Sequence, residues 1–168
     1  MKTPELLVDI DSIPPEGLEM PLELEPARLQ ALVTAEGQPA PAVICPLRGR
    51  LKLDRRGDRL LLKGSFEVTV EIPCDRCLTE VQTVLGGQVD EVLELLSPGD
   101  QGRSEDEDGD GGLMVVDGQA DLSELMAEFF WLAWPYRFIC TEDCAGLCSR
   151  CGADLNQGPC GCQEHDWN

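Results

Sequence analysis

Cysteines near the C-terminal end are the residues whose type and spacing point most clearly to chemistry. Six of the nine cysteines lie within residues 140–162. Cys148 and Cys151 are separated by two residues and followed by glycine, a spacing that lets both thiolates reach one metal ion. Cys160 and Cys162 can supply two further thiolates. Four thiolates leave no open position on the metal, so the spacing predicts a structural zinc site rather than a catalytic one.

A second Cys-x-x-Cys pair, Cys74 and Cys77, allows three interpretations. The pair could be half of a metal site that thiols of the tail complete, it could be a redox pair, or both cysteines could be small buried hydrophobic residues. Cys74 continues the inward-facing positions of the strand before it, so we expect its side chain to be buried. The alternative metal ligands are therefore Cys74, Cys77, Cys140 and Cys144.

The sequence shows no signal for secretion or membrane insertion. Its first residues reach acidic side chains before an apolar run of signal-peptide length has formed, and no segment approaches a membrane span. Disulfide bonds in the tail would need an oxidising compartment, and nine cysteines are an odd number for a set of disulfides. We therefore expect a cytoplasmic protein with reduced thiols and no membrane partner.

Charge is distributed unevenly along this acidic chain. The net charge is −19, which repels nucleic acid in bulk and suits a basic protein partner. Yet seven of the 13 Lys and Arg residues lie between Arg48 and Lys63 of one predicted hairpin, and only Asp54 and Asp58 oppose them in that stretch. This positive stripe predicts contact with an RNA backbone; alternatively, its charges guard an exposed edge and pair with neighbouring acids. The candidate RNA-binding residues are Arg48, Arg50, Lys52, Arg55, Arg56, Arg59 and Lys63.

Hydrophobic periodicity predicts that most of the remaining chain forms strands. Residues 18–25 alternate apolar and acidic side chains, and Pro21 places this strand at a sheet edge. Residues 42–73 alternate over a longer stretch and form a hairpin. Residues 79–96 add a strand or a pair of strands. A capping box begins a helix over residues 121–135.

These elements predict an α+β fold: a mainly antiparallel β-sheet with one principal helix and a small C-terminal zinc-binding tail. We expect four regions. Residues 1–96 form an antiparallel β domain, and residues 97–112 form a flexible acidic loop. Residues 113–139 contribute a strand and a helix that pack on the sheet. Residues 140–168 form the cysteine-rich zinc-binding tail.

The sequence lacks the residue sets that common enzymes use. His165 is the single histidine, so a Ser–His–Asp or Cys–His device would depend on one residue of the tail. Neither a Gly-x-Gly-x-x-Gly loop nor a Walker-type loop occurs. We therefore expect no enzymatic activity and identify no small-molecule substrate.

The order of these motifs resembles the YceD family, bacterial and plastid proteins named for accumulation of large-subunit ribosomal RNA. Two motifs carry the resemblance: Cys74-Asp75-Arg76-Cys77, and the tail motif Gly146-Leu147-Cys148-x-x-Cys151-Gly152-x-x-Leu155-Asn156. The resemblance implies a cytoplasmic, non-enzymatic factor that supports 23S ribosomal RNA accumulation and large-subunit maturation. On the charge pattern, its partner would be precursor ribosomal RNA or a basic ribosomal protein. The rival hypothesis is a thiol-redox or zinc-responsive regulatory protein built on the paired cysteines.

Overall fold

The computed structural model describes residues 6–34, 41–98 and 112–162. Most of the predicted acidic loop, and His165, lie outside these ranges. The chain divides into two compact units. We call the first the sheet unit, which comprises Met1–Val70 and Val84–Trp134, and the second the cysteine unit, which comprises Glu71–Thr83 and Pro135–Asn168.

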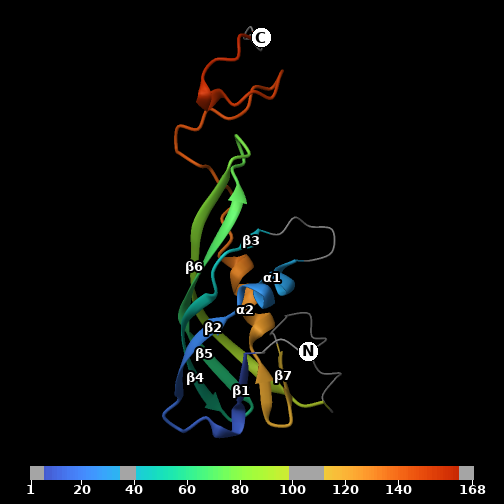
Figure 1. The fold of residues 1–168 in the computed structure, drawn as a ribbon. Helices are drawn as coiled ribbons and strands as arrows, with labels where there is room; N and C mark the ends of the chain where they lie inside the picture. Colours follow the sequence, from blue (N-terminus) through green and yellow to red (C-terminus); the bar gives the residue numbers. More distant parts are fainter. Residues whose placement is uncertain (1–5, 35–40, 99–111, 163–168) are drawn as a thin grey trace, which may run out of the picture. The chain divides into compact units, whose positions relative to one another are not determined.

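The described residues contain eight strands that form one sheet (Figure 1). The strands are β1 (Leu7–Asp9), β2 (Leu18–Leu24), β3 (Ala42–Val43), β4 (Leu47–Arg56), β5 (Arg59–Pro73), β6 (Glu80–Leu96), β7 (Gly112–Val116) and β8 (Gln119–Asp121). Their order is β1-β8-β7-β6-β5-β4-β2, with β3 pairing β5. The β1–β8, β2–β4, β4–β5 and β7–β8 pairs are antiparallel, and β6–β7 is parallel. This mainly antiparallel sheet confirms the predicted fold class.

The β4–β5 hairpin forms because apolar side chains recur at every second position. On β5, Leu62 and Val68 are buried, while Lys63 and Glu67 are exposed on the opposite face. Each buried aliphatic side chain stabilises the fold by about 1.5–3 kcal/mol. β2 lies at an end of the sheet, as Pro21 predicts, since proline has no amide hydrogen to offer a second neighbouring strand.

β6 is one long strand rather than a pair of strands. A glycine on this strand allows a close approach in the core of the sheet unit. A Cβ atom at Gly87 would lie 2.8 Å from Cε1 of Phe66, so only a residue without a side chain lets that ring reach β6. Phe66 is buried as a result, with 4% of its surface exposed.

Two α-helices complete the sheet unit: α1 (Pro26–Val33) and α2 (Ser123–Leu132). They contact each other and lie side by side in Figure 1. α2 is the principal helix and buries Met126, Phe129 and Phe130. Two short 3-10 helices, η1 (Ile10–Ser12) and η2 (Leu155–Gln157), also occur. No helix in the described ranges is long and apolar enough to cross a membrane.

The start of α2 differs from the predicted capping box. Asp121 ends β8, where it pairs with Leu7, so its backbone stays extended and Leu122 becomes the residue before the helix. The Asp121 carboxylate still accepts a hydrogen bond from the Ser123 amide at 2.8 Å. The buried Ser123 hydroxyl accepts one from the amide of Leu6 at 3.0 Å. The pairing of Asp121 with Leu7 and the hydrogen bond between Leu6 and Ser123 therefore determine where the helix begins.

Replacing Phe130 with alanine tests the core beneath α2. Because Phe130 is fully buried, we expect Phe130→Ala to lower the free energy of unfolding by about 3–5 kcal/mol. Leu132→Ala, on the same helix but at a side chain that is 79% exposed, should change it by less than about 0.5 kcal/mol. Urea unfolding followed by circular dichroism measures both. Equal losses from the two variants would contradict the burial pattern of α2.

Candidate metal centres

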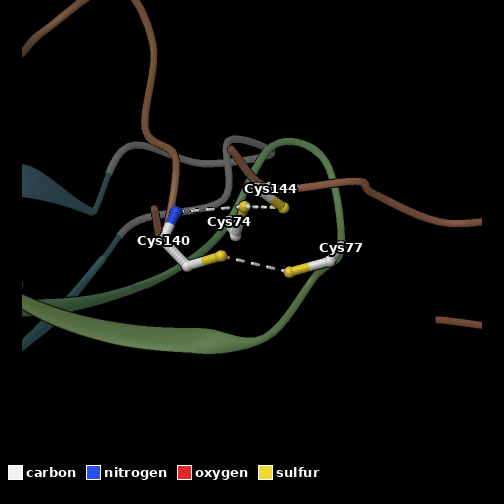
Figure 2. Close-up of side chains that lie close together, drawn as sticks. All are labelled: Cys74, Cys77, Cys140 and Cys144. Atoms are coloured by element: carbon white, nitrogen blue, oxygen red, sulfur yellow. Dashed lines mark hydrogen bonds between the residues drawn. The ribbon is translucent and has the colours of Figure 1, made fainter. Parts of the chain in front are cut away.

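Four cysteines that lie far apart in the sequence converge in the cysteine unit (Figure 2). We call Cys74, Cys77, Cys140 and Cys144 the inner cysteine group. Their sulfur atoms all lie within 4.8 Å of one another. The Sγ atoms of Cys74 and Cys144 are 3.9 Å apart, and those of Cys77 and Cys140 are 3.6 Å apart. Cys74 is fully buried, as its position after β5 predicts.

The two residues between Cys74 and Cys77 hold the C-terminal segment in place. The Asp75 amide donates to the carbonyl of Phe138 at 2.9 Å, and the Phe138 amide donates to the Asp75 carboxylate at 2.7 Å. The Arg76 guanidinium donates to the carbonyl of Cys144 at 2.7 Å. Hydrogen bonds with one charged partner are stronger than neutral ones. The Asp-Arg pair therefore positions both cysteines that arrive from the later segment.

Hydrogen bonds and crowding set the protonation of the inner cysteine group. Burial raises the pKa of the Cys74 thiol, but the amides of Cys77, Arg76 and Cys140 donate to its sulfur and lower the pKa to about 6. For Cys140, a hydrogen bond with Cys144 and burial raise the pKa to about 12. A hydrogen bond with Thr79 lowers the pKa of Cys77 as well, so the four thiols of the group differ in how readily they lose a proton. A bound metal ion would stabilise the thiolate form of every cysteine around it.

The turn after Cys77 has a backbone conformation that suits glycine, but the residue there is leucine. Leu78 has φ = 61°, its amide donates to the Cys74 carbonyl at 2.9 Å, and its side chain is 62% exposed. Gly152 occupies the same place after Cys151, with φ = 72° and a 2.8 Å hydrogen bond to the Cys148 carbonyl. Both Cys-x-x-Cys pairs therefore adopt the same turn, which the sequence predicted only where glycine follows.

The remaining tail cysteines form a second cluster, which we call the outer cysteine group: Cys148, Cys151, Cys160 and Cys162. Its sulfur atoms also lie within 4.8 Å of one another, but Cys151 and Cys162 are exposed. The amides of Cys151 and Arg150 lower the pKa of Cys148 to about 6. Hydrogen bonds with Cys151 and Cys160 raise the pKa of Cys162 to about 12. Like the inner group, the outer group contains one cysteine of lowered and one of raised pKa, but it is more exposed to solvent.

Asn156 connects the two groups, a role that sequence reasoning missed. Its side-chain oxygen accepts from the amide of Ala145 at 2.8 Å, and its Nδ2 lies 3.6 Å from the sulfur of Cys144. Asp154 holds this side chain through a 2.7 Å hydrogen bond. Leu147 packs against the inner group. These contacts explain why the tail motif includes an asparagine and a leucine beside its cysteines.

The geometry of each group fits a metal ion bound by four sulfurs. Sulfur atoms at the corners of a zinc tetrahedron with Zn–S bonds of about 2.3 Å lie roughly 3.8 Å apart. The separations of 3.9 and 3.6 Å in the inner group are close to that value. The structure brings together the four cysteines predicted as ligands, and it gathers the four alternatives into a site of their own. Each group could hold one metal ion.

Most of the predicted RNA-binding residues are already paired with acids. Five of the seven cations form ion pairs: Arg48 with Glu23 (2.8 Å), Arg55 with Asp11 (2.7 Å), Arg56 with Asp54 (2.8 Å), Arg59 with Glu94 (3.7 Å) and Lys63 with Asp90 (3.3 Å). The part of the chain that the structure describes offers no ion pair to Arg50 or Lys52. Most cations of the hairpin therefore pair with neighbouring acids, which was the alternative to RNA contact in the sequence analysis. Among the described residues, Arg50 and Lys52 remain without an acidic partner.

A sheet unit and a cysteine unit with two four-cysteine groups, each of which could hold a metal ion, define the class of protein. Comparison with known families makes the class specific. The chain belongs to the YceD family, since the family model described as "Large ribosomal RNA subunit accumulation protein YceD" matches residues 62–168. The match includes every cysteine of both groups. The family description names no catalytic activity.

Curated relatives from mycobacteria are named only as uncharacterized proteins. The chain is 30% identical over 110 residues to uncharacterized proteins of Mycobacterium bovis and Mycobacterium tuberculosis, a stretch that covers 65% of this chain and 51% of each relative. An uncharacterized protein of Mycobacterium leprae is 29% identical over 113 residues, 66% of this chain and 49% of that relative. The chain thus spans about half the length of the curated relatives it matches. No solved structure matches it.

The number of metal ions bound per chain distinguishes a protein with two metal sites from one with a single site. Because each cysteine group offers four sulfurs, we expect two metal ions per chain by elemental analysis of protein purified without added metal. Cys77→Ser and Cys151→Ser should each lower the count to about one, because either change removes one of four ligands. Cys45→Ser is the control and should leave the count unchanged. An unchanged count in Cys77→Ser would contradict a metal site in the inner group.

Leu78 allows a test of backbone strain at the inner group. A left-handed conformation costs a non-glycine residue about 1–2 kcal/mol, and glycine recovers most of this while adding some freedom to the unfolded chain. We expect Leu78→Gly to raise the urea concentration at which metal is released, equivalent to about 0.5–1 kcal/mol. Leu78→Ala keeps the Cβ atom and should bring no gain. An equal gain from Leu78→Ala would mean that side-chain exposure, not the backbone, limits stability.

Proposed function

We propose that this protein is a non-enzymatic ribosome-assembly factor that supports accumulation of 23S ribosomal RNA and maturation of the large subunit. The observation that carries the proposal is the family match, which spans the inner and outer cysteine groups together. The protein acts by binding precursor ribosomal RNA or a basic ribosomal protein. Its net charge of −19 suits the basic protein, and the unpaired cations of the hairpin suit RNA.

We propose further that the metal in both groups is zinc. Four thiolates in a tetrahedral set select zinc or iron, and a closed set without an open position is typical of structural zinc. The cysteine unit is rich in polar residues and turns, so metal binding supplies free energy that its small core cannot. In this role zinc fixes the positions of Asp75, Arg76 and the tail, and it takes no part in a reaction.

A second function, a thiol-redox or zinc-responsive regulator, has one observation in its favour. Cys148, whose pKa is lowered to about 6, is only half-buried and lies beside the exposed Cys151 and Cys162, and thiolates of lowered pKa that reach solvent are the ones that oxidants attack. If this function applies, mild peroxide should release metal from the outer group and change binding to ribosomal RNA. Thiols that stay inert in the folded, metal-loaded protein would exclude it.

The proposed function is tested by depleting the protein in the organism that encodes it. We expect the ratio of 23S ribosomal RNA to small-subunit ribosomal RNA to fall, and precursor large subunits to accumulate in sucrose gradients. Plasmid-borne wild-type protein should restore the ratio, whereas Cys77→Ser should restore it poorly because a broken metal site destabilises the cysteine unit. Cys45→Ser should restore it fully. A normal ratio after depletion would refute the proposal.

A further inference from the structure

An open hollow of about 840 Å³ lies over β2, β4, β5 and β6 in the sheet unit. A second hollow of about 530 Å³ adjoins it and shares Ser65 and Gln88 with it. The side chains of Arg50, Lys52 and Ser65 around the hollow are exposed, while Leu51 between the two cations is buried. The hollow therefore lies on the face of the sheet that the apolar core does not use.

A short side chain lies beside the cations on this face. Ser65 is directly opposite Arg50 in the β4–β5 pair, and both residues are exposed. Arg50 and Lys52 come from the same strand and line the hollow together with Ser65 and Gln88. The small Ser65 side chain therefore leaves room next to the two cations for a ligand.

The cations around the hollow are arranged in an unfavourable way for the protein alone. Lys52 lies directly opposite Lys63 in the β4–β5 register, and like charges opposite each other destabilise a sheet. Asp90 pairs with Lys63 at 3.3 Å, and Glu19 lies opposite Lys52 on β2 without forming an ion pair. Arg50 faces Pro21 and Ser65, neither of which carries charge. A bound anion would relieve the repulsion and give Arg50 a partner.

We propose that this hollow binds the sugar–phosphate backbone of ribosomal RNA, with Arg50 and Lys52 as its main phosphate contacts. The inference rests on the proposed function. It narrows the RNA-binding surface from seven cations to Arg50 and Lys52, which form no ion pair with any residue that the structure describes. The Arg50 guanidinium can hold a phosphate with two parallel hydrogen bonds, and the Ser65 hydroxyl and Gln88 amide are further donors. A basic ribosomal protein would be repelled by the same cations.

The composition of the hollow also predicts how the RNA is recognised. No aromatic side chain lines the larger hollow, and Phe66, which borders the smaller one, is buried. Bases therefore find no stacking surface, and contact is limited to the backbone. We expect affinity to depend little on sequence and to fall with salt, with a slope of log K against log salt of about −2 for two to three phosphates of single-stranded RNA.

The first test compares two double variants that remove the same charge. Binding of a fluorescein-labelled single-stranded fragment of 23S ribosomal RNA is measured by anisotropy with full-length, metal-loaded protein. Arg50→Ala/Lys52→Ala should weaken binding about tenfold or more and reduce the salt slope by about 1.4, the value for two lost phosphate contacts. Arg56→Ala/Arg59→Ala removes two cations that are paired with acids and line neither hollow, and should weaken binding less than about threefold. Equal losses in both variants would overturn the proposal in favour of a diffuse charge effect.

A second pair of variants probes the hollow without removing a cation. Ser65→Glu places a carboxylate opposite Arg50, where it competes with phosphate, whereas Ser65→Gln adds a side chain of nearly the same size without charge. We expect Ser65→Glu to bind the RNA at least about threefold more weakly than Ser65→Gln, since a close opposite charge of its own satisfies Arg50. Identical binding by Ser65→Glu and wild type would show that the RNA does not enter this hollow.

Failure of this inference can be told apart from failure of the proposed function. In cells depleted of the protein, plasmid-borne wild type should restore the 23S ratio, and Arg50→Ala/Lys52→Ala should not. Full restoration by that variant, together with unchanged RNA affinity in vitro, would reject the hollow and leave the assembly function intact. No effect of depletion on the ratio would reject the assembly function itself.

Discussion

The convergence of sulfur atoms in the cysteine unit is the constraint on which the rest of that unit depends. Cys74 and Cys144 are separated by 70 positions in the chain, yet their sulfurs lie 3.9 Å apart in a buried environment. All four sulfurs of the inner group lie within 4.8 Å of one another, and thiolates held this closely in a buried site would repel one another without a cation. A metal ion turns this repulsion into attraction and makes the convergence stable.

The hydrogen bonds around the inner group hold together the chain segments that carry its cysteines. Asp75 and Arg76 each bind the later segment through its backbone, so their contacts depend on the path of the chain and not on which side chains it carries. Asn156 extends the same arrangement to the outer group through Ala145 and Cys144. Outer contacts of this kind orient metal ligands and are as necessary as the ligands themselves. The family motif therefore combines cysteines that could hold a metal ion with the residues that position them.

Local patterns in the sequence predicted what depends on neighbouring residues, and failed where distant segments meet. Alternation along β5 predicted its buried face and the burial of Cys74, because side-chain direction in a strand repeats every two residues. The parallel β6–β7 pair was not predicted, since most of the chain between these strands gives no periodic signal. For the cysteines, the spacing of Cys148 and Cys151 was informative. Assigning Cys140 and Cys144 to Cys74 required knowledge of the fold.

The charged hairpin shows why counting cations predicts a binding surface only in part. Pairing at 2.7–3.7 Å neutralises five of the seven cations locally, and a paired cation must give up its acid before it can bind phosphate. Arg50 faces only proline and serine in the strand register, and Lys52 faces Lys63 on one side and Glu19, with which it forms no ion pair, on the other, so neither has to give up an acid. In a chain of net charge −19, two such cations can attract RNA at one place while the remaining surface repels it. An acidic protein can thus bind RNA selectively at a single face, because repulsion elsewhere suppresses every other mode of contact.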